Sequence, residues 1–372
     1  MQNRIYFLKY NILFAICQDG IMMMYQKYAE VAIDMMTKQI VFTKPYVAEL
    51  LDVECLPPKE NEVTVSLEYS AISSGTEKAN LIGLRPGTNV SEDDEAVFPR
   101  SAGYSAAGVV TEIGAGVKNV KVGDRVIVYH GKHKKNITIS ANTVLRIPND
   151  VPSAEASMAF ISIFPLAAIR KTKLEIGESA MVMGLGMLGI FAVQELRTSG
   201  AYPIIAVDPV NDRRELALKM GADFALDPTE EDFAKKVRSL TGGGVNVCIE
   251  VTGLGIGLIQ ALDCMKQYGR VALLGCTRSS QFQIDYYAKV HGPGISLIGA
   301  HTNARPRNES SPGLWTDRDD LQTILNLIRG KRLNFKDMIS EIHSPTEAGQ
   351  VYTRLANDKN FPIGVLFDWN NI

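Results

Sequence analysis

Short apolar or alternating segments separated by turns dominate the chain from about residue 39 to residue 126. Segments 39–42, 48–53 and 62–70 have this character, and Pro45 and Pro57 interrupt them. Alternation over a few residues is typical of strands with one buried face. Glycine-rich turns continue at similar spacing as far as residue 126. The pattern predicts a small β-barrel.

From residue 180 the pattern changes to apolar runs that alternate with segments of helical period. An apolar segment at 151–170, capped near Ser153, predicts a helix that leads into this part. Gly221 and Gly269 lie where helix C-caps belong. Strand–helix alternation predicts an α/β fold with a parallel sheet covered by helices on both faces. The predicted strands are 180–183, 203–207, 222–226, 245–251, 270–274 and 295–299.

Both ends of the chain differ from these two parts. Beyond residue 299 the sequence is rich in turns and predicts helices at 318–330 and 346–356. The first 35 residues contain one apolar run, Ile12 to Cys17, which is too short to span a bilayer. No small-residue cleavage site follows it, so it does not fit a signal peptide. We expect residues 1–35 to be an extra segment, with a translation start near Met36 instead.

Composition narrows the classes of function. The chain has 372 residues, 46% of them hydrophobic and 22% charged, and a formal net charge of −2. This length suggests two domains, and the charge gives no reason to expect nucleic acid or a membrane as a partner. None of the five cysteines has the Cys-x-x-Cys spacing of a metal site. We expect Cys55, Cys248, Cys264 and Cys276 to be buried apolar residues of a cytoplasmic protein.

The strongest motif is a glycine fingerprint, Gly184-x-Gly186-x-x-Gly189, between an apolar strand and a helix. In dinucleotide-binding folds the first glycine permits a tight turn and the second lets the backbone approach a pyrophosphate. The third lets helix and strand pack closely. Met187 and Leu188 then begin the helix, where free backbone N–H groups face the phosphates. The context predicts a dinucleotide site.

The residues that follow the predicted strand 203–207 indicate which dinucleotide binds. Asp208 lies 19 residues beyond Gly189, near the spacing of roughly 20 expected for the acid that binds the adenosine ribose. A carboxylate there repels a 2′-phosphate, which favours NAD over NADP. Arg213 and Arg214 follow closely, and an arginine at this place often accommodates NADP. NAD is the prediction, with NADP the alternative.

Several motifs in order resemble the medium-chain dehydrogenase/reductase superfamily, in particular its zinc-containing alcohol dehydrogenase branch. The resemblance runs from about residue 39 to the end and rests on five segments: Gly103 to Val110, Val122 to Val126, the glycine fingerprint, Glu250 to Gly253, and Leu274-Gly275. It implies a Rossmann domain inserted in a GroES-like catalytic barrel, with the active site between them. It also implies a homodimer or tetramer. Further cofactor contacts are implied at Thr252, Gly253, Gly275 and Cys276.

The resemblance gives domain boundaries. The GroES-like catalytic domain is expected at 36–160, and the Rossmann NAD-binding domain at 161–301. Residues 302–372 are then expected to return to the catalytic domain.

The chain departs from the family where zinc binds. The family's cysteine ligand corresponds to Ser73, and its histidine ligand to Tyr104. Residues 159–162 hold no cysteine or acid, and 127–150 lack the cysteines of the structural zinc lobe. Hydroxyl groups are poor zinc ligands beside thiolate and imidazole. We therefore expect no zinc, as in a zinc-lacking subgroup that includes bacteriochlorophyllide-dehydrogenase-like and bi-domain oxidoreductases.

Without a metal, side chains must take the proton and stabilise charge on the substrate oxygen. The resemblance places five candidates in the cleft: Thr76, Glu77, Tyr104, His130 and His301. Glu77 is interpreted as an orienting partner, and His133 also lies near the cleft. Histidine suits proton transfer because an unperturbed imidazole has a pKa of about 6.5. Each histidine could instead be structural, as we expect for His291 and His343.

The sequence therefore predicts an NAD-dependent, zinc-independent oxidoreductase that acts on a small molecule, a secondary alcohol or ketone such as a polyol or sugar derivative. The alternatives are an NADPH-dependent quinone or enone reductase, a zinc-dependent alcohol dehydrogenase with unusual ligands, and a nucleotide-binding subunit without turnover. Arg305 and Arg307 are interpreted either as ligands of an acidic substrate or as part of a solvated loop.

Overall fold

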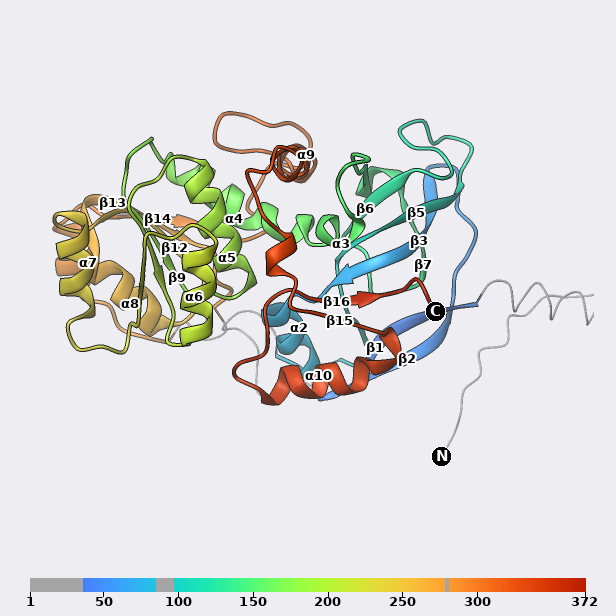
Figure 1. Cartoon of the computed structure of the whole chain (residues 1–372), viewed down its shortest axis with the longest axis horizontal. Coiled ribbons are helices and arrows are strands. Elements are labelled where there is room, and N and C mark those ends of the chain that lie inside the picture. Colours follow the sequence, from blue (N-terminus) through green and yellow to red (C-terminus); the bar gives the residue numbers. More distant parts are fainter. Residues whose placement is uncertain (1–35, 85–96, 278–280) are drawn as a thin grey trace, which may run out of the picture.

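The computed structural model describes residues 36–84, 97–277 and 281–372, which form two parts side by side (Figure 1). A parallel-sheet part contains β9 to β14, and a barrel part contains the remaining strands. The expectation of an extra segment at 1–35 concerns residues outside the described ranges.

The barrel part is built from two sheets of mainly antiparallel strands. One has the order β2-β1-β4 and the other β15-β16-β3-β5-β6-β8, with β7 beside β3. A Cβ on Gly108 would lie 2.2 Å from the Ser66 carbonyl oxygen, so glycine lets β3 and β5 approach closely. The predicted strands at 39–42, 48–53 and 62–70 are confirmed as β1 to β3. The bounds are β1 Met36–Lys44, β2 Val47–Glu54, β3 Glu62–Ala71, β4 Arg100–Ser101, β5 Ser105–Ile113, β6 Arg125–Tyr129, β7 Asn136–Ser140 and β8 Val144–Arg146.

Four helical segments belong to the barrel part or join it to the parallel sheet. They are α2 (Ser74–Leu81), the 3₁₀ turn η1 (Ala141–Thr143), and the pair α3 (Ser153–Ala156) and α4 (Ala159–Thr172). The single helix predicted at 151–170 is thus wrong in detail, because Ser157 and Met158 separate two helices. Nearly every residue of α4 is buried, and the helix packs against α5, α9 and the parallel sheet.

The parallel sheet has the order β11-β10-β9-β12-β13-β14, with all its pairs parallel. The order reverses between β9 and β12, where doubly wound sheets bind ligands beyond the carboxyl ends of their strands. All six predicted strands are confirmed, with shifted ends. They are β9 Ala180–Met183, β10 Ile204–Val207, β11 Phe224–Leu226, β12 Val245–Glu250, β13 Met265–Leu273 and β14 Ser296–Gly299. Its helices are α5 Met187–Thr198, α6 Asn211–Lys219, α7 Phe233–Thr241 and α8 Gly255–Asp263, with a π-turn η2 at Tyr287–His291.

The two glycines expected at helix C-caps differ. Gly221 follows α6 with a φ of +111°, a left-handed conformation that glycine adopts freely. The prediction for Gly269 is wrong, because α8 ends at Asp263 and β13 already contains Gly269. The positive φ there belongs to Tyr268.

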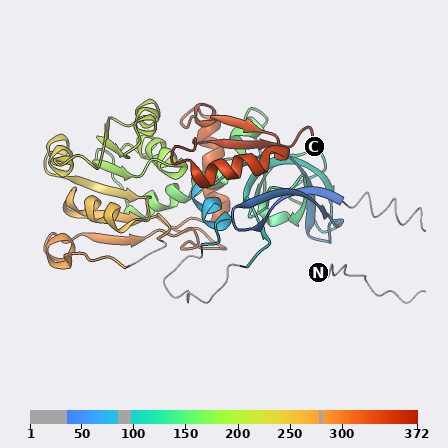
Figure 2. The same cartoon turned by 90° about the horizontal axis from the view of Figure 1, so that it is seen from below.

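The chain after β14 returns to the barrel. Strand β16 pairs antiparallel with β3, and α10 packs against β2 and α2 (Figures 1 and 2). Trp369, at the end of the chain, is fully buried in the barrel core. The last elements are α9 Asp317–Arg329, η3 Lys336–Met338, β15 Glu341–His343, η4 Pro345–Glu347, α10 Ala348–Asn357 and β16 Val365–Asp368.

Within the described ranges, no helix combines the length and apolarity needed to cross a membrane. The expected burial of cysteines is confirmed for Cys248 and Cys264, whereas Cys55 is half-buried. The expectation of burial is wrong for Cys276, which is exposed. Cys276 follows the carboxyl end of β13, where the chain leaves the sheet.

Candidate active site

The three glycines of the fingerprint occupy three different environments. Gly184 has a φ of +97°, which suits the turn that leaves β9. A Cβ on Gly189 would lie 2.0 Å from the Gly184 carbonyl oxygen, so only glycine lets α5 pack this close. A Cβ on Gly186 would meet nothing within 4 Å. The loop therefore leaves open space at the start of α5, where the N-terminus of a helix attracts a phosphate. Met187 is buried and Leu188 is half-buried.

Asp208 holds this loop from the neighbouring strand. Its carboxylate accepts hydrogen bonds from the Leu185 N–H, at 2.8 Å, and from the Val210 N–H, at 2.9 Å. The Arg213 guanidinium lies 3.6 Å from the same carboxylate and is about a quarter exposed. Arg214 donates to the Asp208 carbonyl oxygen. The Asp208 carboxylate oxygens keep lone pairs for a ribose hydroxyl. Arg213, which is more exposed than Asp208, lies beside them.

The loop after β12 packs directly on the glycine loop, and the loop after β13 packs on the loop after β12. A Cβ on Gly184 would lie 2.9 Å from the Thr252 methyl carbon, and one on Gly275 only 2.2 Å from the Gly253 nitrogen. Glu250, buried at the end of β12, accepts from the Thr252 and Gly253 N–H groups. Burial raises the pKa of Glu250, although these hydrogen bonds oppose the shift. Thr252, Gly253, Gly275 and the exposed Cys276 thus share one edge with the fingerprint.

Tyr104 and Ser73 form the polar pair of the barrel side. The Tyr104 hydroxyl donates to the Ser73 Oγ at 2.6 Å, and its ring packs beside Phe160 and Phe164. Burial raises the pKa of Tyr104 to about 12, with Glu77 adding to the shift while hydrogen bonding with Ser73 and Thr76 opposes it. The phenol is therefore neutral at working pH and acts as a donor.

Glu77 lies beneath this pair in the interior. It accepts a hydrogen bond from the Ser73 N–H at 2.8 Å, and the Tyr352 hydroxyl donates to it. The His133 Nε2 is 3.1 Å from the same carboxylate, and the His133 Nδ1 is 2.7 Å from the Ser70 Oγ. His133 is fully buried and lies behind Glu77 in the interior. Glu77 orients the start of α2 and is screened from solvent.

His130 lies at the end of β6, next to Asp317 at the start of α9. Its Nε2 is 3.1 Å from the Asp317 Oδ2, and its ring stacks edge-on against Phe160 at 4.7 Å between centroids. Burial would raise the pKa of Asp317, but hydrogen bonding with His130 and the Arg305 charge outweigh it and lower the pKa. The ionised Asp317 carboxylate therefore orients the His130 imidazole, and the His130 side chain remains 54% exposed.

Arg305 is an internal residue. Its guanidinium lies 2.5 Å from the Asp317 Oδ1, also pairs with Asp320, and is only 7% exposed. The interpretation of Arg305 within a solvated loop is therefore wrong. Arg307, two residues later, is exposed.

The predicted catalytic residues are only partly brought together. Ser73 and Thr76 both interact with the Tyr104 hydroxyl, and the Phe160 ring contacts both Tyr104 and His130. His301 lies beyond β14 and is exposed, with its Nδ1 accepting from the Asn303 N–H at 3.1 Å. Neither a hydrogen bond nor a ring contact joins His301 to the others within the described residues.

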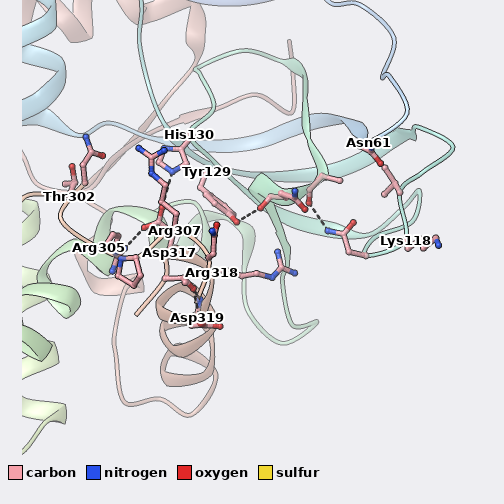
Figure 3. A pocket seen from close by; sticks show the side chains of 18 of the residues that line it. Asn61, Lys118, Tyr129, His130, Thr302, Arg305, Arg307, Asp317, Arg318 and Asp319 are labelled. Atoms are coloured by element: carbon pink, nitrogen blue, oxygen red, sulfur yellow. Dashed lines mark hydrogen bonds and ion pairs between the residues drawn. The ribbon is translucent and has the colours of Figure 1, made fainter. Parts of the chain in front are cut away.

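A groove of about 920 Å³ lies at His130, between loops of the barrel and the segment that follows β14. Figure 3 shows Thr302 at one end, with His130, Arg305 and Arg307 near it, and Asn61 and Lys118 at the opposite end. Its walls come from the loop at 116–119, from η1, from residues 302–308 and from the first turn of α9. The groove brings barrel loops against a segment nearly 200 residues distant in sequence.

The family's zinc position carries hydroxyl groups in this chain. Within the described residues, no group of three or more His, Cys, Asp and Glu side chains is placed to hold a metal. At the position itself the candidate donors are the Ser73 and Tyr104 hydroxyls, which hydrogen-bond to each other. A neutral phenol with a pKa near 12 is a poor ligand for zinc.

Sequence reasoning missed two partners in this site. Ser73 was considered only as a replaced metal ligand, and it proves to be the acceptor of the Tyr104 hydroxyl. Asp317 lies just before the helix predicted at 318–330, and it proves to orient His130. Nothing in the local sequence indicates a histidine 187 positions away.

Two family models match the chain. A model described as "Alcohol dehydrogenase GroES-like domain" matches residues 59–145, and one described as "Zinc-binding dehydrogenase" matches residues 188–314.

Related proteins match over most of their length. The L-threonine 3-dehydrogenase of Pyrococcus horikoshii is 32% identical over 340 residues, which cover 81% of this chain and 90% of the relative. The D-guloside 3-dehydrogenase of Escherichia coli is 26% identical, with 89% and 100% covered. Among solved structures, an Escherichia coli oxidoreductase/dehydrogenase of unknown specificity superposes with a TM-score of 0.77 at 18% identity, covering 90% of this chain and 99% of that one.

Proposed function

Since the chain belongs to the zinc-type medium-chain alcohol dehydrogenase superfamily and is an NAD(P)-dependent oxidoreductase acting on CH–OH groups, we propose that it works with NAD and without catalytic zinc. We propose a secondary alcohol of a polyol or sugar derivative as its substrate. The observation that carries this proposal is the Tyr104–Ser73 hydrogen bond, which stands where the family's metal ligands would be. The names of the threonine and guloside dehydrogenases support a secondary alcohol.

The nucleotide supplies the hydride acceptor when it binds. The open space at Gly186 admits the pyrophosphate to the N-terminus of α5, while Asp208 keeps the glycine loop in place. Ser73 and Thr76 then offer hydroxyl donors to the substrate oxygen, and the hydrogen that Tyr104 donates holds the Ser73 Oγ in place. His130, oriented by Asp317 and open to solvent, accepts the proton that the alcohol loses.

Metal analysis together with an activity assay tests the zinc-free mechanism. We expect purified protein to contain much less than one zinc per chain. NAD-dependent oxidation of a polyol panel should then be unchanged after dialysis against a chelator, because no step depends on a Lewis acid. A chelator-sensitive activity restored by zinc would contradict the proposal. Absence of NADH formation with every alcohol would overturn the proposed enzyme itself.

The cofactor preference is the second prediction. We expect the dissociation constant of NADP to exceed that of NAD by roughly tenfold or more, since a 2′-phosphate would lie beside the Asp208 carboxylate. Arg213→Ala should weaken NADP binding further and leave NAD binding nearly unchanged, because Arg213 is the exposed cation beside that carboxylate. Fluorescence titration with both reduced cofactors measures this.

Arg197→Ala is the matched control, because Arg197 is an exposed arginine of the same part that pairs with Asp223. It should change neither affinity. Tighter binding of NADPH than of NADH in the unaltered protein would reverse the assignment.

A further inference from the structure

The groove beyond His130 is much larger than a small alcohol needs. Its volume of about 920 Å³ is at the upper end of ordinary ligand pockets. Tyr104 is outside its lining, and the Phe160 ring contacts both Tyr104 and His130. A substrate that reacts near Tyr104 would therefore extend past His130 into the groove. The groove is placed to bind the part of the substrate that does not react.

The groove is lined by more positively charged than negatively charged side chains. Four cationic side chains, Lys118, Arg305, Arg307 and Arg318, line it against two carboxylates, Asp317 and Asp319. Asp317 is neutralised by Arg305. Asp319 accepts hydrogen bonds from Ser310 and Thr316, which lower its pKa and keep it ionised at the helix start.

Three of these cations, Lys118, Arg307 and Arg318, form no ion pair within the described residues. Arg318 donates to the Val144 carbonyl oxygen at 3.2 Å and interacts with the Tyr129 hydroxyl, and its charge helps to lower the pKa of Asp319. Arg307 lies at the His130 end, Lys118 at the opposite end, and Arg318 between them (Figure 3). Guanidinium groups that are not already paired bind carboxylate and phosphate oxygens through two parallel hydrogen bonds.

The uncharged residues of the groove can form hydrogen bonds with the hydroxyl groups of a ligand. The groove is rich in side-chain amides and hydroxyls, contributed by Asn61, Asn119, Asn142, Thr302, Asn303 and Asn308. The amides of Asn61, Asn303 and Asn308 make no hydrogen bond to other described residues, so their donors and acceptors are available to a ligand. Only a few apolar residues, among them Val117 and Pro306, interrupt this lining. An aliphatic or quinone-like substrate would leave these amides unpaired.

From this combination we infer that the groove is a substrate subsite for a polyhydroxylated chain or ring that carries an oxyanion, with Arg307 and Arg318 binding the anion. The inference rests on the proposed polyol-type substrate and narrows it to an acidic one. The oxyanion is a phosphate ester or a carboxylate, two groups that share the same recognition chemistry.

Calorimetric titration of the full-length protein saturated with NADH tests the inference. The probes share a carbon skeleton: D-glucitol, D-glucitol 6-phosphate and D-gluconate, with inorganic phosphate as the bare ion. We expect at least one anionic probe to bind about tenfold or more tightly than D-glucitol at low ionic strength, because bonds to a charged group are stronger than neutral ones. The tighter of the two identifies phosphate or carboxylate. The preference should weaken as salt is added.

The double variant Arg307→Gln, Arg318→Gln should reduce this preference to about twofold or less, since both guanidinium groups are lost. Arg329→Gln is the control, an exposed arginine at the far end of α9 that pairs with Asp150. It should keep the full preference, and thermal melting should show all variants folded.

Four outcomes overturn the inference: equal binding of the neutral and anionic probes, no binding of any probe, an unchanged preference in the double variant, and inorganic phosphate binding as tightly as the sugar phosphate. NADH formation is measured separately with the same probes and NAD. Turnover without an anionic preference would refute the subsite alone. Binding with that preference but no hydride transfer would refute the proposed enzyme and leave the subsite in place.

Discussion

Replacing Tyr104 by phenylalanine is expected to lower kcat by about a hundredfold to a thousandfold, the range found when one preorganised donor is removed from a developing oxyanion. The phenol is held neutral by its raised pKa and donates its one hydrogen to the Ser73 Oγ at 2.6 Å, so Tyr104 fixes the Ser73 hydroxyl, whose own hydrogen is left for the substrate oxygen. Steady-state kinetics with NAD and a turned-over polyol measure the change. The affinity for NADH should stay unchanged, because the glycine loop does not contact Tyr104.

The same change should barely affect folding. The variant loses one hydrogen bond, which contributes about 1 kcal/mol to the free energy of unfolding, while the ring keeps its packing beside Phe160 and Phe164. Tyr268→Phe is the control, because Tyr268 is 73% exposed on the parallel-sheet part. Full activity of the Tyr104 variant would remove Tyr104 from the catalytic machinery.

Substitutions at Gly186 and Gly189 are expected to affect different properties of the protein. A change at Gly186 should weaken nucleotide binding, and a change at Gly189 should lower stability. Gly186→Val should leave the melting temperature nearly unchanged, because a Cβ there meets no atom within 4 Å and its φ of −70° suits any residue. The added side chain occupies the space a pyrophosphate needs. We therefore expect the dissociation constant of NADH to rise about tenfold to a hundredfold, as when charge-assisted hydrogen bonds are lost.

Gly189→Ala is the matched change three residues later. Its Cβ would lie 2.0 Å from the Gly184 carbonyl oxygen, so α5 must move away from β9. We expect the free energy of unfolding to fall by about 1–3 kcal/mol or more, the usual cost of overpacking. Chemical denaturation and NADH titration of both variants give the comparison. Equal losses of stability in the two would show that the space at Gly186 is not free.

The repeated local patterns made most of the fold predictable. Alternating segments gave β1 to β3, and apolar runs separated by helical segments gave the six parallel strands. The fingerprint also assigned different tasks to Gly184, Gly186 and Gly189, and their surroundings agree with these assignments. Errors arose where no periodic signal marks a boundary, as at the break between α3 and α4. At Gly269, a glycine within a strand was interpreted as a helix end.

The sequence by itself determined the fold class, the nucleotide-binding loop and the missing thiolate and imidazole ligands at the family's zinc position, because each is a matter of residue type at short spacing. Only the tertiary structure decided what surrounds the reacting groups. It joined Tyr104 to Ser73, oriented His130 with Asp317, buried Arg305 against two carboxylates and enclosed His133 in the core. These contacts join residues that lie between 12 and 187 positions apart. Their partners are chosen by the packing of α4, α9 and the barrel, which no local pattern of the sequence encodes.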